Sequence, residues 1–192
     1  MHILDNFEYI QRTAKHAAQS IANKTRVTWW AWHIENVLPD DIIVDIRDFM
    51  DANQKWEDVD LQTQWPRRAV HWDQVPSSAY KRMHYAFQQL STVVSEAVGE
   101  QVEFQHCNMW EDNKDYTIPA HVDNNNIRVA IQIYLNDADP DCGTALYNEK
   151  EEQIHKFPFV KNTGYILKND PQSYHGMMTP GNIRRSLYVN YR

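Results

Sequence analysis

Hydrophobic and polar residues alternate with a period of two in the second half of the chain. Between 127 and 135 every second residue is a branched apolar one, and the positions between them carry Arg128, Gln132 and Tyr134. Such alternation is typical of a β-strand with one face packed on a core. The second face is polar but carries little charge, which favours a partly enclosed environment over open solvent.

The closing segment, 184–191, alternates in the same way. Its apolar residues share a face with Arg185, whereas Arg184 and Ser186 lie on the other face. In a two-sheet barrel, one strand face packs against covering helices and the other lines the interior. Arg184 is therefore predicted to point inward and Arg185 outward, and Tyr134 belongs to the same inward set. The alternative is an ordinary sandwich strand with a solvated outer face.

The first half of the chain shows mainly helical periodicity. Apolar residues at three- and four-residue spacing predict a helix over 7–21 with Asp5 as its N-cap. A second helix is predicted over 40–49, and the clearest one runs from Pro76 to Gly99. We expect this last helix to cover the back of the larger sheet.

Two other segments of the first half have more than one interpretation. The tryptophans of the extended stretch 26–34 are interpreted as sheet core, the alternative being a stacking surface for a base or a sugar. The stretch 54–73 has weak periodicity and contains Arg67 and Arg68. Long irregular stretches in compact domains are often functional lids, so a lid over the substrate and a plain surface connection both remain open.

Composition limits the classes of protein to consider. The chain has 192 residues, 42% of them hydrophobic, which suits one compact domain. Only two cysteines occur, Cys107 and Cys142, without CxxC spacing, so neither a disulfide scaffold nor a zinc site is indicated. The net charge of -7 argues against broad, non-specific nucleic-acid binding. No membrane-spanning run and no secretory leader is recognised, so we expect a cytoplasmic protein.

The candidate chemistry lies in His121-Val-Asp123, followed about fifty residues later by His175. Side chains two residues apart on a strand project from the same face, so His121 and Asp123 are predicted to lie together. A second histidine from another strand would complete a set of two imidazoles and one carboxylate, which is the facial triad of non-haem Fe(II) oxygenases. A bare HxD triplet is a weak signal by itself, and a second copy occurs at His71-Trp72-Asp73. We interpret that copy as a loop or strand-end pair.

With these features the chain resembles a known family. The stretch YTIPAHVDNNNIRVAIQIYLN (116–136) and the closing SYHGMMTPGNIRRSLYVNY (173–191) are similar to the core of the Fe(II)/2-oxoglutarate-dependent dioxygenases, and most of all to their prolyl-hydroxylase-like branch. The similarity covers roughly residues 100–192, and the first hundred residues match only in general layout. Collagen prolyl hydroxylases have lysine where Arg184 stands, so the resemblance is greater to the oxygen-sensing and the bacterial or viral members.

The resemblance implies a fold. We expect an α+β protein with a double-stranded β-helix, which is a jelly-roll or cupin-like barrel, and with N-terminal helices packed on the major sheet. One oxygenase domain is expected over 1–192, in which residues 1–100 form the helical support and first strands and residues 101–192 form the metal-binding barrel core.

The resemblance also implies a site and a reaction. His121, Asp123 and His175 are expected to ligate Fe(II). Arg184 and the hydroxyl of Tyr134 are expected to hold the distal carboxylate of the co-substrate 2-oxoglutarate, with Ser186 assisting. O2 is the other co-substrate, and succinate and CO2 are released. The hard chemistry belongs to the cofactor, and the protein supplies orientation and electrostatics.

The substrate remains open at this point. The branch resemblance favours hydroxylation of a protein or peptide side chain. One alternative is an oxygenase that acts on a free small molecule or a nucleobase, with Arg67, Arg68 and tryptophans lining an open groove if the substrate is a polymer. Another alternative is a barrel that binds metal without catalysis. Fold does not decide among these, because function depends on the site.

Overall fold

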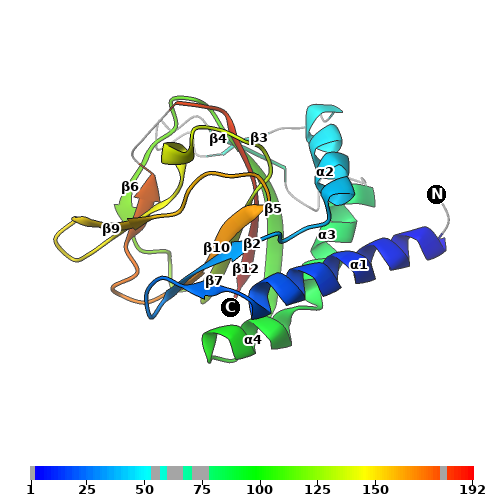
Figure 1. The fold of residues 1–192 in the computed structure, drawn as a ribbon, viewed down its shortest axis with the longest axis horizontal. Coiled ribbons are helices and arrows are strands. Elements are labelled where there is room, and N and C mark those ends of the chain that lie inside the picture. Colours follow the sequence, from blue (N-terminus) through cyan, green and yellow to red (C-terminus); the bar gives the residue numbers. More distant parts are fainter. Residues whose placement is uncertain (1–2, 53–56, 60–66, 71–77, 178–180) are drawn as a thin grey trace.

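In the computed structural model, helices cover one face of a large antiparallel sheet and a small sheet faces its other side (Figure 1). The structure describes residues 3–52, 57–59, 67–70, 78–177 and 181–192. Its helices are α1 (Ile3–Ala22), α2 (Asp40–Ala52), α3 (Ser78–Gln88), α4 (Ser91–Val98) and the 3-10 turn η1 (Pro140–Cys142).

The described strands form two sheets. The large sheet has the order β1-β2-β10-β7-β12-β5-β4-β3, and the small sheet has the order β6-β11-β8-β9. The strands are β1 (Thr25–Arg26), β2 (Ala31–Glu35), β3 (Glu57–Val59), β4 (Arg67–Val70), β5 (Phe104–Asp112), β6 (Ile118–His121), β7 (Val129–Tyr134), β8 (Ala145–Tyr147), β9 (Gln153–Lys156), β10 (Thr163–Lys168), β11 (His175–Met177) and β12 (Arg184–Tyr191). All pairings are antiparallel.

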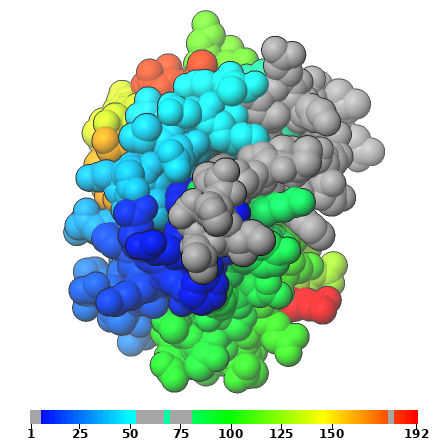
Figure 2. Space-filling model, turned by 90° about the vertical axis from the view of Figure 1, so that its right-hand side faces the viewer, coloured from blue at the N-terminus to red at the C-terminus, as the bar shows by residue number. Residues whose placement is uncertain are grey.

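The main core lies between the helices and the large sheet. Ile21 of α1, Ile46 of α2 and Phe87 of α3 are fully buried against apolar residues of β7 and β12. Figure 2 shows the helical side of the molecule, where the atoms of α1 (blue) and α2 (cyan) form much of the surface. The predicted helical cover of the larger sheet is therefore confirmed. Leu187 and Val189 belong to this core, as the alternation of the last strand predicted.

A second apolar cluster lies between the two sheets. It joins Tyr134 and Tyr165 of the large sheet to Leu146 of the small sheet and to Phe157 and Phe159 of the connection after β9. The small sheet is therefore packed on the inner face of the large one. The tryptophan-rich stretch contributes Trp30 to this cluster.

Three predictions about the first half need correction. The first helix begins at Ile3, so Asp5 lies inside it and is not its N-cap, and Phe7 is 63% exposed. The segment 26–34 is not one strand, because residues 27–30 form a bend between β1 and β2. Trp30 and Trp32 are core, as predicted, but Trp29 is 47% exposed.

The helix predicted from Pro76 to Gly99 is two helices. The α-helical hydrogen-bond pattern changes at Leu90, whose N–H donates to the carbonyl of Phe87, three residues earlier in the chain. Ser91 then donates its hydroxyl to the Gln88 carbonyl and accepts the N–H of Phe104. Local side-chain bonds of this kind compete with the regular helical pattern. Gly99 ends α4 with a φ of 69°, as its identity predicted.

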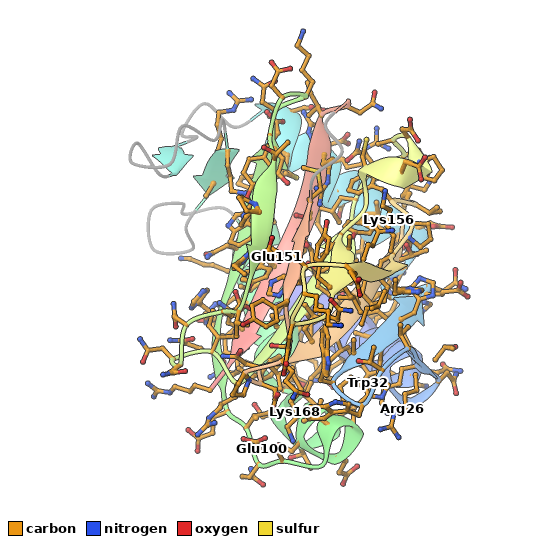
Figure 3. All side chains as sticks on the ribbon, turned by 90° about the vertical axis from the view of Figure 1, so that its left-hand side faces the viewer. Arg26, Trp32, Glu100, Glu151, Lys156 and Lys168 are labelled. Carbon is orange, nitrogen blue, oxygen red and sulfur yellow. The ribbon has the colours of Figure 1, made fainter. Side chains whose placement is uncertain are left out.

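Several smaller features complete the fold. An ion pair of 2.9 Å between Lys168 and Glu100 lies at the end of the large sheet where β5 begins (Figure 3). Cys107 and Cys142 are both buried, and neither takes part in a disulfide bond. Within the described ranges, no helix combines the length and the apolar character that crossing a bilayer requires.

Candidate functional site

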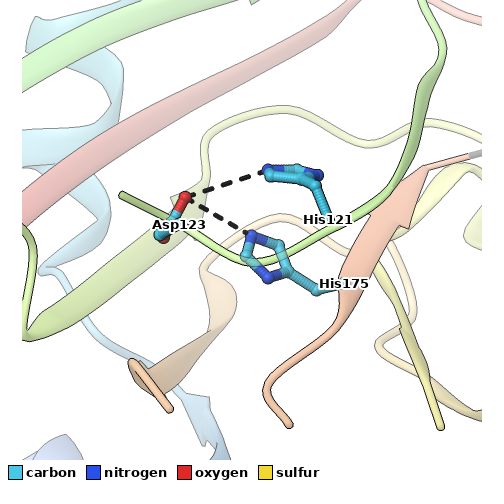
Figure 4. Close-up of side chains that lie close together, drawn as sticks. All are labelled: His121, Asp123 and His175. Atoms are coloured by element: carbon cyan, nitrogen blue, oxygen red, sulfur yellow. Dashed lines mark ion pairs between the residues drawn. The ribbon is translucent and has the colours of Figure 1, made fainter. Parts of the chain in front are cut away.

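Three side chains from two segments that are about fifty residues apart in the sequence meet between β6 and β11 (Figure 4). His121 ends β6, and His175 begins β11 directly opposite it. Asp123 lies just beyond the strand, not within it as predicted, yet its Oδ1 is 3.8 Å from Nε2 of each histidine. Among the described residues, this is the one group of three or more His, Cys, Asp or Glu side chains arranged to hold a metal ion.

Glycine at position 176 permits the approach of β11 to β6. A Cβ there would lie 2.6 Å from the carbonyl oxygen of Ile118, which is too close for any side chain. Gly176 is next to His175, so the residue type at 176 keeps the two histidine-bearing strands in register.

Both histidines are held in the same tautomer. Nδ1 of His121 is 2.9 Å from the Pro119 carbonyl, and Nδ1 of His175 is 3.0 Å from the Ser173 carbonyl. A carbonyl oxygen only accepts, so each Nδ1 carries the hydrogen and each Nε2 presents a lone pair to the centre. Burial lowers the pKa of His175 below its ordinary 6.5, with Asp123 opposing the shift, so this imidazole is neutral at pH 7. Metal ligation requires this neutral form.

Hydrogen bonds to the side chain and to the backbone of Asp123 position the carboxylate of the triad. Oδ2 of Asp123 accepts the hydroxyl of Tyr188 at 3.3 Å, which leaves Oδ1 facing the histidines. The amide of Asn169 donates to the backbone carbonyls of Asp123, Asn124 and Ile127, at 3.2, 3.0 and 2.8 Å. Residues 124–127 form a turn, in which the N–H of Ile127 donates to the carbonyl of Asn124 at 3.1 Å. The loop that carries Asp123 is therefore fixed to β10, β12 and its own turn.

The three ligand atoms lie within 4.8 Å of one another, close enough to converge on one metal ion. Two ligands at about 2.1 Å from a metal and at right angles to each other are about 3 Å apart, so the 3.8 Å separations need only a small contraction. A small cavity of about 70 Å³ opens beside the triad and is lined by all three residues. The donor set and the open side match the arrangement in which one face is ligated by protein and the other is left for exchangeable ligands.

An inner triplet of charges lies on the cavity side of the large sheet. Arg67, Asp112 and Arg184 stand opposite one another on β4, β5 and β12. Arg67 bonds to both oxygens of Asp112, from Nε at 2.5 Å and from Nη2 at 3.2 Å. Arg184 lines the cavity and is 3% exposed, and its Nη2 is 3.9 Å from Asp112, beyond hydrogen-bond distance. Nε and Nη1 of Arg184 have no hydrogen-bond partner among the described residues.

An outer triplet lies at the neighbouring register position, on the helical side. Arg68, Glu111 and Arg185 stand opposite one another on the same three strands. Glu111 pairs with Arg68 and, at 2.9 Å, with Arg185. Arg185 also pairs with Asp51 of α2 at 2.6 Å. The predicted facing of the two arginines is therefore confirmed, with Arg184 inward and Arg185 outward.

Tyr134 and Ser186 lie on the inner face but are already bonded. The Tyr134 hydroxyl accepts the N–H of Thr144 at 3.1 Å and donates to its Oγ1 at 3.2 Å. Ser186 accepts from the side-chain amide of Gln132 at 2.8 Å. Thr144, Gln132 and Tyr165, which bond to one another, form this polar wall of the cavity.

Sequence reasoning did not assign a role to several residues of the cavity. The facing of Asp112 and Tyr188 could have been predicted, because each belongs to an alternating strand and lies on the face that bears the site. Arg67 was named only as part of the open groove that a polymer substrate would favour; in the structure it lines the cavity and is paired with Asp112. Thr144 and Asn169 belong to no recognisable motif, and only the fold brings them to the site.

Two earlier interpretations cannot be compared with the structure. The second HxD triplet, His71-Trp72-Asp73, lies outside the described residues. Most of the stretch 54–73, including Trp56 and Trp65, also lies outside them.

Sequence comparison finds no relatives for this chain: no family model matches it and no curated protein is significantly similar. Solved structures do share its fold. A prolyl-4-hydroxylase from Pseudomonas putida superposes with a TM-score of 0.68 at 16% identity, over 94% of this chain and 99% of that one.

Two further structures extend the comparison. A prolyl hydroxylase from Trichoplax adhaerens, in complex with an oxygen degradation domain peptide fragment of hypoxia inducible factor, has a TM-score of 0.63 at 13% identity and covers 100% of this chain and 93% of that one. HygX from Streptomyces hygroscopicus, with nickel and 2-oxoglutarate bound, has a TM-score of 0.61 at 13% identity. The match covers 84% of this chain and 82% of that one. The resemblance stated from sequence is thus confirmed at the level of structure: this chain has the fold of the prolyl hydroxylases and of related 2-oxoglutarate-binding proteins.

Proposed function

We propose that this chain is an Fe(II)- and 2-oxoglutarate-dependent oxygenase, built as one double-stranded β-helix domain over 1–192. One observation carries the proposal. A buried guanidinium with two nitrogens that lack a hydrogen-bond partner among the described residues, that of Arg184, lines the same cavity as the His121–Asp123–His175 triad. A metal centre and a separate carboxylate-binding cation in one cavity are what a 2-oxo diacid co-substrate requires.

The triad is proposed to hold ferrous iron through Nε2 of each histidine and Oδ1 of Asp123. Bound there with 2-oxoglutarate and O2, the iron supplies the oxidation that releases succinate and CO2. The chain's own contribution is to fix the ligands. Carbonyl acceptors orient both imidazoles, and Tyr188 holds the second oxygen of Asp123 away from the metal.

Arg184 is proposed to bind the distal carboxylate of 2-oxoglutarate. The inner triplet has two cations and one anion, whereas Asp51 gives the outer triplet a second acid. A buried charge without a partner is unfavourable, so the inner side has room for one more anion. A charge-assisted contact to this anion contributes about 1.5 to 3 kcal/mol.

Tyr134 and Ser186 are proposed to assist from behind the polar wall, through their hydrogen bonds to Thr144 and Gln132. The Tyr134 hydroxyl hydrogen can turn from Thr144 Oγ1 to a carboxylate oxygen while the hydroxyl still accepts the Thr144 N–H. Ser186 acts one step further away, because it holds the amide of Gln132, which lines the cavity. Removal of the Tyr134 hydroxyl is therefore the more disruptive of the two changes.

The substrate is proposed to be a protein or peptide side chain, hydroxylated as in prolyl hydroxylases. Support comes from the two prolyl hydroxylases that share the fold, one of them in complex with a peptide fragment. Candidate peptides, metabolites and oligonucleotides should be incubated with the protein, iron, 2-oxoglutarate and O2. Mass spectrometry would then identify the class that gains one oxygen atom. A gain confined to metabolites or oligonucleotides would contradict the peptide proposal but not the oxygenase one.

The oxygenase activity is tested most directly without any substrate. The folded protein, supplied with Fe(II), 2-oxoglutarate and O2, is expected to form succinate slowly through uncoupled turnover. Succinate should be absent when iron is chelated or O2 is excluded. Failure of iron-loaded, folded protein to form succinate under any of the substrate conditions above would contradict the proposed function.

A prediction about metal affinity follows from the contact between Tyr188 and Asp123. Tyr188→Phe removes only the hydroxyl that occupies Oδ2, so we expect Fe(II) or Co(II) to bind roughly 10- to 100-fold more weakly. The measurement is a metal titration of the apoprotein, together with the Co(II) visible spectrum, which reports the coordination number. The spectrum is expected to change because Asp123 is then free to bind through both oxygens.

Tyr191→Phe is the matched control for this prediction. Tyr191 lies on the opposite face of the same strand, is also buried, and donates its hydroxyl to the Phe87 carbonyl at 2.9 Å. It should lower stability without changing metal affinity. Equal metal affinity of Tyr188→Phe and the wild type would show that the hydroxyl does not position the ligand.

A further inference from the structure

We infer that Arg67 controls the affinity of the cavity for its co-substrate, by taking up both oxygens of Asp112 and so leaving Arg184 without a hydrogen bond to that acid. The inference rests on the proposed function, because the ligand concerned is 2-oxoglutarate. Arg67 acts here as a positioning residue, and its effect reaches the ligand through two other side chains.

The comparison between the two triplets shows what Arg67 does. On the outer side one acid, Glu111, pairs with both arginines, so neither Arg68 nor Arg185 is left open. On the inner side the acid is engaged by one arginine only. The strands and the register are the same on both sides, so the backbone does not explain the difference.

The difference lies in the geometry of Asp112. Its carboxylate is fully buried, and Arg67 bonds to both of its oxygens. The nearest atom of Arg184 is 3.9 Å away, which is an ion-pair distance but not a hydrogen bond. A bidentate arginine satisfies the acid, so Nε and Nη1 of Arg184 remain without a partner among the described residues and can donate to another anion.

Arg67 is itself held firmly in this position. Its guanidinium carbon lies 3.9 Å from the centre of the Trp110 ring and 4.4 Å from that of Tyr116. Cation–π contacts of this kind favour a fixed orientation of the guanidinium. The pairing with Asp112 is therefore a built feature of the cavity wall.

Removal of Arg67 has a predictable consequence. A fully buried carboxylate needs a cation, and Arg184 becomes the nearest one. A co-substrate must then compete with Asp112 for Arg184. We expect Arg67→Met to raise the dissociation constant of 2-oxoglutarate by about tenfold or more.

Removal of the acid reverses this effect. In Asp112→Asn no anion competes for Arg184, so 2-oxoglutarate should bind at least as tightly as to the wild type. In Arg67→Met/Asp112→Asn the affinity should return to that of Asp112→Asn. The two substitutions are therefore expected to be strongly non-additive, which a double-mutant cycle measures.

The experiment is calorimetric titration of 2-oxoglutarate into Mn(II)-loaded protein without O2, for the wild type, both single variants and the double variant. Arg68→Met is the matched control, since it removes the neighbouring arginine of the same strand and its pairing with Glu111 on the outer side. Metal affinity and thermal unfolding are measured for every variant. If Arg67→Met alone fails to fold, the comparison of Asp112→Asn with the double variant still tests the inference.

The outcomes separate this inference from the proposed function. The inference is supported if Arg67→Met binds 2-oxoglutarate more weakly, if adding Asp112→Asn restores the affinity, and if Arg68→Met keeps the affinity of the wild type. Unchanged affinity in Arg67→Met, or a double variant as weak as Arg67→Met, overturns it. A double variant that binds more weakly than Asp112→Asn also overturns it. A wild-type protein that does not bind 2-oxoglutarate contradicts the proposed function itself.

Discussion

Replacing Asp123 with alanine is expected to abolish 2-oxoglutarate turnover and to reduce iron affinity more than any other single change in the cavity. The substitution removes the one anionic ligand and leaves two neutral imidazoles, His121 and His175, to hold a divalent cation. The loss should exceed the roughly 10- to 100-fold effect of removing a hydrogen bond to a ligand, because a metal-bonded atom is lost. Metal titration and succinate formation measure the two effects.

The control for this variant is Asp115→Ala. Asp115 is exposed and lies in the connection that leads to β6, so its removal changes the local charge without touching the triad. It should retain both metal binding and succinate formation. Full activity of Asp123→Ala would refute the assignment of Asp123 as a ligand.

Arg184→Ala is expected to have the second largest effect. It removes the only cation that lines the cavity with open N–H groups among the described residues. Loss of a charge-assisted contact of about 1.5 to 3 kcal/mol corresponds to a roughly 10- to 150-fold weaker binding of 2-oxoglutarate. The concentration of 2-oxoglutarate required for half-maximal succinate formation should rise accordingly, while metal affinity stays the same.

Arg185→Ala is the internal comparison, because it removes an identical side chain from the adjacent position. Arg185 pairs with Asp51 and Glu111 on the helical side, and Glu111 keeps Arg68 as a partner when Arg185 is removed. The 2-oxoglutarate requirement should therefore change little. The reverse result, with a large effect at 185 and a small one at 184, would mean that the strand faces the other way in solution.

The alternation of residues along β12 was enough to predict which arginine points inward. Side chains on a strand alternate strictly, so one apolar face fixes the direction of every neighbour. The HxD motif and the distal histidine were predictable for a different reason, since metal ligation needs particular residue types. The helical cover of the sheet followed from periodicity, although the break at Leu90 depended on local bonds of Ser91 that no periodicity reveals.

The charge arrangement around Arg184 was not predictable from the sequence. Arg67 and Asp112 are 45 residues apart, and only the pairing of β4 with β5 makes them partners. Arg67 also lies in a stretch with weak periodicity. No strand was predicted there, so the direction of the Arg67 side chain could not be predicted either. The hydrogen bonds of the Tyr134 hydroxyl were not predictable for a similar reason, because their partner Thr144 directly precedes β8 of the small sheet.

Arg184 and Tyr188 stand on one strand, four residues apart and on the same side. At about 3.3 Å of rise per residue, β12 sets a fixed span of about 13 Å between the anchor for the diacid and the support for the metal-binding carboxylate. Inserting one residue between them would turn one of the two side chains toward the helices. The distance between the cationic group and the metal site can therefore be adjusted finely only through the length of the side chain at position 184, where lysine and arginine are the two cationic choices.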